Sequence, residues 1–181
     1  KMAAESGVAA GAHPGYQDLV GFGRRNMNVA PAEVTDIVMY QIGALEAFCR
    51  ANGIAMQHVK PHGAMYNMAE KDDKLAEAIC RGIKAVNPDL ILLGPGSGKM
   101  VKVAKALGLK TAGEVFADRA YMEDGTLVPR SQEGAMITDE EEAVARVLEM
   151  VQKGTVTAIT GKKIEVQADS VSVNTDGICL Y

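Results

Sequence analysis

Two histidines occupy equivalent points of the sequence and could carry out acid–base chemistry. His13 follows the apolar run 8–12, His62 follows the apolar run 54–59, and each has a proline and a glycine beside it. A neutral imidazole can move a proton near neutral pH, and it can also bind a metal ion. The third histidine, His58, lies inside the second run, where packing is the simpler interpretation. We therefore select His13 and His62 as catalytic candidates.

Acidic and basic side chains follow apolar runs in the same way. Glu114 and Asp118 are four residues apart across the end of the run 110–116. They could supply a general base or a metal ligand, or they could pair with nearby arginines. The basic groups could clamp a carboxylate by bidentate hydrogen bonds, or they could hold their loops together by pairing with acids such as Asp18. The candidates for substrate binding are Lys60, Arg24, Arg25, Arg119 and Asn67.

The glycine-rich stretch at residues 94–100 is a poor match to a phosphate-binding loop. The first glycine of the G-x-x-x-x-G-K-[ST] motif would fall at Leu93, and Met100 replaces the hydroxyl residue that holds magnesium. A helix that starts here could still attract an anion through its N–H groups.

Strand-length apolar runs alternate with helical patterns, and this alternation would position the candidate residues. Strands are expected at 8–12, 54–59, 90–93, 110–116 and 170–174, a hairpin at 155–160 and 163–167, and helices at 31–51, 72–86 and 100–107. Such alternation predicts parallel strands with right-handed crossovers. Polar residues at the carboxyl ends of the strands would then converge, where ligands bind in both open sheets and β/α barrels.

A last helix is expected to begin after Thr138, which can form a capping box with Glu141. Its buried face is expected to contain the apolar residues at helical spacing, which are Ala143, Val144, Val147, Leu148 and Val151.

Composition narrows the class of protein. The 181 residues suit one domain, so we expect a single domain over residues 1–181. A net charge of −4 does not favour binding to nucleic acid or to an anionic membrane. No apolar run approaches the roughly 18 residues that a membrane-spanning helix needs. The three cysteines show no paired spacing, which argues for a reducing, cytoplasmic compartment. Lys1 lies in what resembles the end of a helix, so we expect further units before it.

Three motifs in this chain resemble the LamB/YcsF family of 5-oxoprolinase A subunits. Gly-Ala-His-Pro-Gly-Tyr at 11–16 leads into Gly-Phe-Gly-Arg-Arg at 21–25, and Val-Lys-Pro-His-Gly-Ala-Met-Tyr-Asn spans 59–67. Glu-Val-Phe-Ala-Asp-Arg-Ala-Tyr at 114–121 is followed by Gly-Thr-Leu-Val-Pro-Arg at 125–130. The motifs occur in the family's order and cover most of the chain, so the resemblance is more specific than any short pattern.

The resemblance implies a fold and an activity. The fold is an irregular β/α barrel related to the glycoside hydrolase/deacetylase barrels, with N-terminal units before residue 1. The activity is ATP-dependent opening of the 5-oxoproline lactam to glutamate, together with partner subunits B and C. The family's opening motifs are absent here. Residues 173–176 are Val-Asn-Thr-Asp where the family usually carries Val-His-Gly-Asp, so Asn174 replaces an expected histidine.

The leading hypothesis is therefore a cytoplasmic hydrolase that opens a cyclic amide with ATP. His13, His62 and either Glu114 or Asp118 would transfer protons or polarise the carbonyl, and arginines would hold a carboxylate or a phosphorylated intermediate. ATP would be bound jointly with the partner subunits. One alternative is a metal-dependent, deacetylase-like amidohydrolase in which His13 and His62 bind a divalent ion. Another is a catalytically inactive scaffold subunit, which Asn174 supports best.

Overall fold

The structure is a computed structural model, and it describes residues 1–173. The chain divides into two compact units. Within the described residues, the first comprises residues 1–94 and 99–111, and the second comprises residues 95–98 and 112–173. Each unit has strands and helices of its own.

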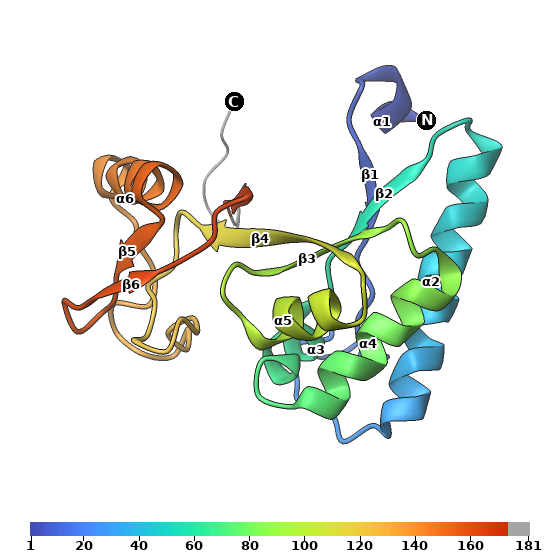
Figure 1. The fold of residues 1–181 in the computed structure, drawn as a ribbon, viewed down its shortest axis with the longest axis horizontal. Helices are drawn as coiled ribbons and strands as arrows, with labels where there is room; N and C mark the ends of the chain where they lie inside the picture. The colour runs from blue at the N-terminus through green and yellow to red at the C-terminus, as the bar shows by residue number, and fades with distance from the viewer. Residues whose placement is uncertain (174–181) are drawn as a thin grey trace. The chain divides into compact units, whose positions relative to one another are not determined.

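Three parallel strands form the sheet of the first unit (Figure 1). They are β1 (Ala10–Ala12), β2 (Met56–Val59) and β3 (Ile91–Pro95), in the order β1-β2-β3. β1 pairs in parallel with β2, and β2 pairs in parallel with β3. Parallel pairing puts the carboxyl ends of these strands at the same edge, so the loops that follow β1 and β2 are neighbours.

The helices of the first unit are α1 (Met2–Glu5), α2 (Pro31–Ala51), α3 (Gly63–Ala69), α4 (Asp73–Val86) and α5 (Lys99–Ala106). Helix α2 begins with Pro31, which is preorganised for a first helical turn, and α4 begins after Asp72, whose carboxylate accepts the N–H groups of Lys74 and Leu75. Helices α2 and α4 pack side by side, and α4 also packs against α5 (Figure 1). The apolar faces of these helices therefore cover one another.

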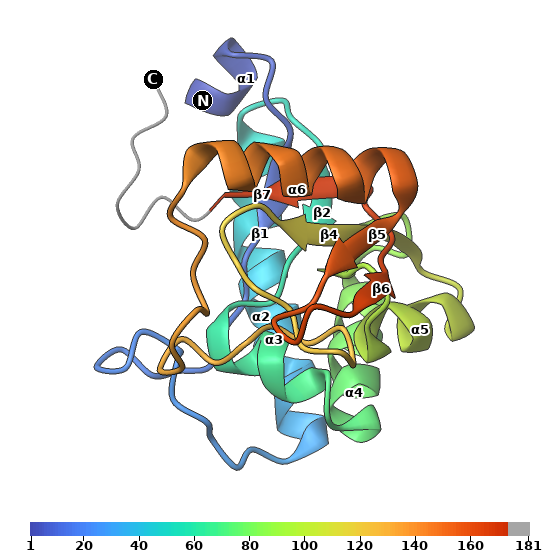
Figure 2. The ribbon, with the colours of Figure 1, turned by 90° about the vertical axis from the view of Figure 1, so that its left-hand side faces the viewer.

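The second unit combines a parallel strand pair with a hairpin. β4 (Lys110–Phe116) pairs in parallel with β7 (Ser170–Ser172), and β5 (Thr155–Thr157) pairs in antiparallel fashion with β6 (Lys163–Glu165). Helix α6 (Glu140–Lys153) packs against β5 (Figure 2). The core of this unit is a cluster of buried residues, Val115, Tyr121, Met150, Val156 and Val166.

Two expectations for the last helix are wrong. The cap is Asp139, whose carboxylate accepts the Glu142 N–H at 2.8 Å, and not Thr138. Val144, Leu148 and Val151, expected in the buried stripe, are 59%, 49% and 55% exposed. Met150 is the residue of α6 that the core buries, because the helix presents the face carrying it to β5.

The predicted alternation of strands and helices is otherwise confirmed, with parallel pairing where it was expected. The short helix α3 was not predicted, because seven residues give too little periodicity to detect. None of the helices within residues 1–173 has the length and apolarity that crossing a membrane requires.

Candidate functional site

His13 and His62 lie side by side beyond the carboxyl ends of β1 and β2. The pairing of these strands continues past their ends, because the Lys60 N–H donates to the Ala12 carbonyl (2.9 Å) and the His62 N–H donates to the Pro14 carbonyl (2.8 Å). Nδ1 of His62 then lies 2.9 Å from Nε2 of His13, and the two rings meet edge to face. Strand pairing thus brings together two histidines that are 49 residues apart in the sequence.

In each ring, the nitrogen that does not contact the other histidine binds a backbone carbonyl group. Nδ1 of His13 donates to the Lys60 carbonyl at 2.6 Å, and Nε2 of His62 donates to the Phe22 carbonyl at 2.7 Å. A carbonyl oxygen can only accept, so these two contacts assign the proton of each neutral ring. The side chain of His13 is exposed, and that of His62 is half-buried.

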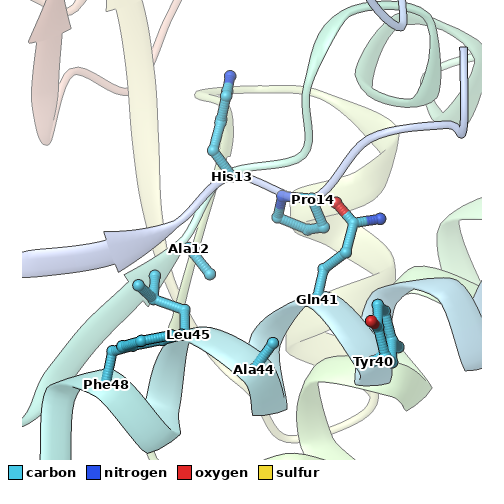
Figure 3. Close-up of a pocket in the computed structure, with 8 residues that line it drawn as sticks. All are labelled: Ala12, His13, Pro14, Tyr40, Gln41, Ala44, Leu45 and Phe48. Atoms are coloured by element: carbon cyan, nitrogen blue, oxygen red, sulfur yellow. The ribbon is translucent and has the colours of Figure 1, made fainter. Parts of the chain in front are cut away.

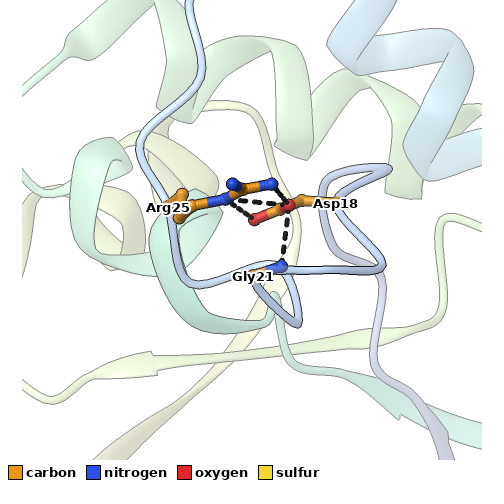
Figure 4. Close-up of polar contacts among 3 residues, drawn as sticks. All are labelled: Asp18, Gly21 and Arg25. Atoms are coloured by element: carbon orange, nitrogen blue, oxygen red, sulfur yellow. Dashed lines mark hydrogen bonds and ion pairs between the residues drawn. The ribbon is translucent and has the colours of Figure 1, made fainter.

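An ion pair closes the loop that precedes α2. Nε of Arg25 lies 3.0 Å from each carboxylate oxygen of Asp18, Nη2 also contacts this carboxylate, and the Gly21 N–H donates to it at 2.9 Å (Figure 4). The hydrogen bonds from Arg25 lower the pKa of Asp18 to about 2. Arg25 therefore holds the loop together, which is one of the two interpretations that the sequence left open.

The same loop brings Phe22 and Arg24 toward His62. Phe22 has a φ of 53°, which a non-glycine residue rarely adopts, and its ring meets the His62 ring edge to face with centroids 5.3 Å apart. The guanidinium of Arg24 lies 5.6 Å from the centroid of the Phe22 ring. The Phe22 ring thus contacts both the Arg24 guanidinium and the His62 imidazole.

A pocket of about 340 Å³ lies between the end of β1 and helix α2. It is lined by Ala12, His13, Pro14, Tyr40, Gln41, Ala44, Leu45 and Phe48 (Figure 3). The imidazole of His13 points away from the α2 side chains (Figure 3). The Gln41 amide binds both backbone groups of Gly15, donating to the carbonyl at 2.8 Å and accepting the N–H at 3.1 Å. Gln41 therefore fixes the backbone beside His13, and no sequence pattern had indicated this role.

Glu114 and Asp118 belong to the second unit. Glu114 is buried on β4 and accepts a hydrogen bond from the Ser172 hydroxyl on β7. Asp118 is 4% exposed, and neither of its carboxylate oxygens has a hydrogen-bond partner among residues 1–173. A buried carboxylate without a donor is costly. Asp118 is thus a group that a ligand or a water molecule would satisfy.

Arg119 and Tyr121 follow Asp118 and are buried as well. Nη2 of Arg119 donates to the Val128 carbonyl at 2.6 Å, and burial, followed by repulsion from Arg130, lowers the pKa of Arg119. The Tyr121 hydroxyl accepts the Phe116 N–H at 2.9 Å, and burial raises the pKa of Tyr121 to about 12. Arg119 is therefore a buried cation whose guanidinium already donates a hydrogen bond to one backbone carbonyl.

The start of α5 does not suit a phosphate group. The carboxylate of Glu70 accepts the N–H of Lys99 at 2.6 Å and that of Met100 at 3.1 Å, so it already satisfies the donors an anion would use. Gly96 has a packing role, because a Cβ there would come 1.9 Å from the Gln167 carbonyl oxygen. The N–H groups that were expected to attract an anion are therefore already bound by the Glu70 carboxylate.

The remaining candidates occupy different settings. Lys60 follows β2 and supplies the carbonyl that His13 contacts, whereas Asn67 is exposed on α3. His58 packs against Gly11, where a Cβ would come 2.1 Å from Nε2, and burial lowers the pKa of His58. This contact agrees with the packing role expected for His58.

Within the described part of the chain, no group of three or more histidine, cysteine, aspartate or glutamate side chains is arranged to hold a metal ion. Cys49 and Cys80 are free and buried. Asn174 and Cys179 lie outside the described residues.

Comparison with known proteins places the chain in a family. The model of the LamB/YcsF family matches residues 1–178. The chain is 63% identical to the 5-oxoprolinase A subunit of Clostridium beijerinckii, over 98% of this chain and 69% of that protein. It is 52% identical to the 5-oxoprolinase A subunit of Bacillus subtilis, over 97% of this chain and 68% of that protein.

A solved structure is similar as well. The crystal structure of a lactam utilization protein from Thermus thermophilus superposes with a TM-score of 0.88 at 48% sequence identity, covering 94% of this chain and 69% of that one. The predicted α/β fold class is confirmed by this similarity. Motifs, fold and relatives agree, and the chain belongs to the LamB/YcsF family.

Proposed function

We propose that this chain is the A subunit of a 5-oxoprolinase, which hydrolyses the lactam of 5-oxoproline to glutamate with ATP. Two observations support the proposal. Relatives with 63% and 52% identity carry this name over nearly the whole chain, and the His13–His62 contact places two imidazoles at one strand edge. The imidazole contact carries the chemical part of the argument, because hydrolysis of a cyclic amide requires proton transfer.

The chemistry explains why imidazoles are suited to this reaction. A lactam is stabilised by resonance, so its opening needs a polarised carbonyl, an activated water molecule and a proton for the departing nitrogen. We assign the proton transfers to His13 and His62. Glu114 and Asp118 are assigned to the same reaction as a base or as hydrogen-bond acceptors for substrate or water. The geometry of Asp118 supports this role, because its buried carboxylate has no donor among residues 1–173.

Substrate binding is assigned to basic and amide side chains near these groups. Arg24, Lys60 and Asn67 belong to the unit that carries the histidines, and Arg119 follows Asp118 directly. A guanidinium can hold the carboxylate of 5-oxoproline through two hydrogen bonds. Arg25 is a weak candidate, since Asp18 engages its guanidinium.

ATP and the partner subunits belong to the proposal as well. The helix start at Lys99 does not fit a triphosphate, because the Glu70 carboxylate occupies its N–H groups. We therefore propose that ATP is bound jointly with subunits B and C. The free, buried Cys49 and Cys80 support a cytoplasmic location, since a reducing compartment keeps thiols unpaired.

We further propose that residues 1–181 form part of one irregular β/α-barrel domain. In such a barrel the strands are parallel and the loops that follow them face one side. Parallel pairing of β1 with β2 and of β4 with β7 supports this arrangement.

The test is an assay of glutamate release from 5-oxoproline by the chain assembled with subunits B and C. We expect turnover that depends on ATP. His13→Ala and His62→Ala should each lower kcat by about 100-fold or more, the usual contribution of a positioned acid or base. His58→Gln is the matched control, because His58 is a histidine of the same unit that packs against Gly11.

Two outcomes would contradict the proposal. The first is a complex that assembles and binds 5-oxoproline without turnover, which would identify the chain as a scaffold protein of the complex. The second is a stoichiometric divalent ion that is lost on His62→Ala, which would favour the metal-dependent, deacetylase-like hydrolase instead.

A further inference from the structure

Gln41 attaches helix α2 to the turn that carries His13 (Figure 3). Its amide donates to the Gly15 carbonyl at 2.8 Å and accepts the Gly15 N–H at 3.1 Å. The side chain therefore exchanges both hydrogen bonds with one residue, as the facing residue of a neighbouring strand would. Two bonds from one planar amide leave the Gly15 backbone little freedom to rotate.

The helix that carries Gln41 is itself held in place. Val38 and Ile42, on either side of Gln41 in the sequence, are fully buried. The Thr35 hydroxyl of α2 donates to the Ala78 carbonyl of α4 at 3.0 Å, and the two helices pack side by side. Closely packed cores resist small displacements. Gln41 therefore projects from a rigid support.

The turn at residues 13–15 determines the position of both imidazoles. His13 begins the turn, and the buried Pro14 restricts its backbone. The Pro14 carbonyl accepts the backbone N–H of His62 at 2.8 Å. Gly15 lies against the His62 side chain, because a Cβ at Gly15 would come 3.2 Å from Cβ of His62. A displacement of the Gly15 backbone would therefore move His13 and press on His62.

We propose that Gln41 is a positioning residue for the reaction of His13 and His62, acting on both imidazoles through the backbone of the turn. This inference rests on the proposed function. It concerns where the imidazoles lie, and it holds whether they transfer protons or bind a metal ion. A displacement of about 1 Å at a reacting group can lower a rate about 100-fold. The contribution of Gln41 should therefore appear in kcat.

Substrate affinity should depend less on Gln41. Arg24 belongs to a loop that the Asp18–Arg25 ion pair closes, and Lys60 follows β2. These substrate-binding candidates are thus held by contacts of their own. Loss of the Gln41 amide should lower kcat with little change in KM, whereas a general loosening of the unit would change both.

Steady-state kinetics of the chain assembled with subunits B and C tests the proposal. Gln41→Met keeps the length of the side chain and removes both hydrogen bonds. It should lower kcat for glutamate release about 10–100-fold and change KM for 5-oxoproline by less than about twofold. Gln57→Met is the matched control, because the Gln57 amide oxygen lies 3.3 Å from Nδ1 of His58, the histidine assigned to packing. It should leave kcat and KM unchanged, and circular dichroism shows which variants remain folded.

A second variant reaches the same turn from its other side. Gly15→Ala places a Cβ against His62, so it should also lower kcat. If Gln41 acts through Gly15, the double variant should lose less than the product of the two single losses, because both substitutions displace one turn. Losses that multiply would overturn the inference, as would a Gln41→Met enzyme with the kcat of the wild type or with a change in KM alone.

Hydrogen exchange of the Gly15 amide tests the same contact without substrate, ATP or partner proteins. The Gly15 N–H should be protected in the wild-type chain, and it should exchange about 10-fold faster or more in Gln41→Met. An unprotected Gly15 amide in the wild type would overturn the inference. A protected amide in a chain whose complex shows no turnover would contradict the proposed function instead, so the two failures are distinguishable.

Discussion

At the scale of single residues, the site depends on contacts that only particular side chains can make. Asp18 accepts from both Arg25 and a backbone N–H, and this combination closes a loop of eight residues. Gly11, Gly21 and Gly96 each have a neighbouring atom within about 2 Å of where a Cβ would stand. These glycines therefore allow close packing of polar groups.

The Asp18–Arg25 ion pair predicts a dependence of stability on pH. The folded pKa of about 2 lies below the value of about 4 expected in the unfolded chain. The contribution of the ion pair is therefore complete above about pH 4 and is lost as the pH falls through about 2. Thermal unfolding of the wild type and of Asp18→Asn should differ at pH 6 and converge toward pH 2. A difference that stays constant over this range would contradict the prediction.

The glycine at position 96 predicts a stability effect of defined sign. Gly96→Ala should destabilise the protein by about 1–3 kcal/mol, because the new Cβ overlaps the Gln167 carbonyl oxygen. Gly43→Ala is the matched control, since a Cβ in this part of α2 meets nothing within 4 Å. It should stabilise the protein by about 0.5–1 kcal/mol through helix propensity. Urea unfolding measures both, and equal effects of the two substitutions would contradict this account.

At the scale of elements, helix ends and helix faces are determined by their partners. The N-terminus of α5 is capped by Glu70, which lies at the end of α3, and not by a residue of its own segment. Helix α6 exposes Val144, Leu148 and Val151 although their spacing is that of a buried stripe. The local sequence indicates where a helix lies, but its neighbours select the face that is buried.

The cap on α5 predicts that Glu70 stabilises the helix start. Burial raises the pKa of Glu70, and the two backbone N–H groups oppose this shift. Glu70→Ala should lower the free energy of unfolding by about 1 kcal/mol, the typical value of a lost cap. Glu77→Ala is the control, because its exposed pair with Arg81 contributes only about 0.3–0.5 kcal/mol. Equal losses would show that Glu70 is no cap. A phosphate-induced rise in Tm for Glu70→Ala alone would show that the freed N–H groups bind anions.

At the scale of the whole molecule, each unit has its own interior. The first contains α2 packed on α4, with Cys80 fully buried on α4, and the second contains the cluster around Val115 and Met150. These apolar interiors provide the main stabilising contribution to the fold.

The burial of Cys80 provides a probe of global unfolding. Burial raises the pKa of Cys80 to about 12, so at pH 8 very little reactive thiolate is present in the folded chain. In a Cys49→Ser, Cys179→Ser variant, labelling of Cys80 should be negligible in buffer. It should rise with urea in parallel with the loss of helical circular dichroism. Rapid labelling in buffer would show that α4 opens locally.

Much of the fold and part of the site can be predicted from the sequence. The strands at β1, β2 and β4, and the helices α2 and α4, lie where the apolar periodicity places them. The motif around His13 and the motif around His62 follow two strands that pair in parallel, so their proximity follows from topology. Local propensity and periodicity are short-range properties, and for this reason they are visible in the sequence.

The rest was decided by the tertiary structure. The amide of Gln41 on Gly15, the carboxylate of Glu70 on α5, the carbonyl of Phe22 on His62 and the exposed face of α6 all depend on segments distant in the sequence. Hydrogen-bond partners 26, 29 and 40 residues apart leave no periodic trace, because their geometry exists only once the strands and helices have packed. Sequence alone thus determined the family and most of the elements, whereas packing decided which polar groups meet.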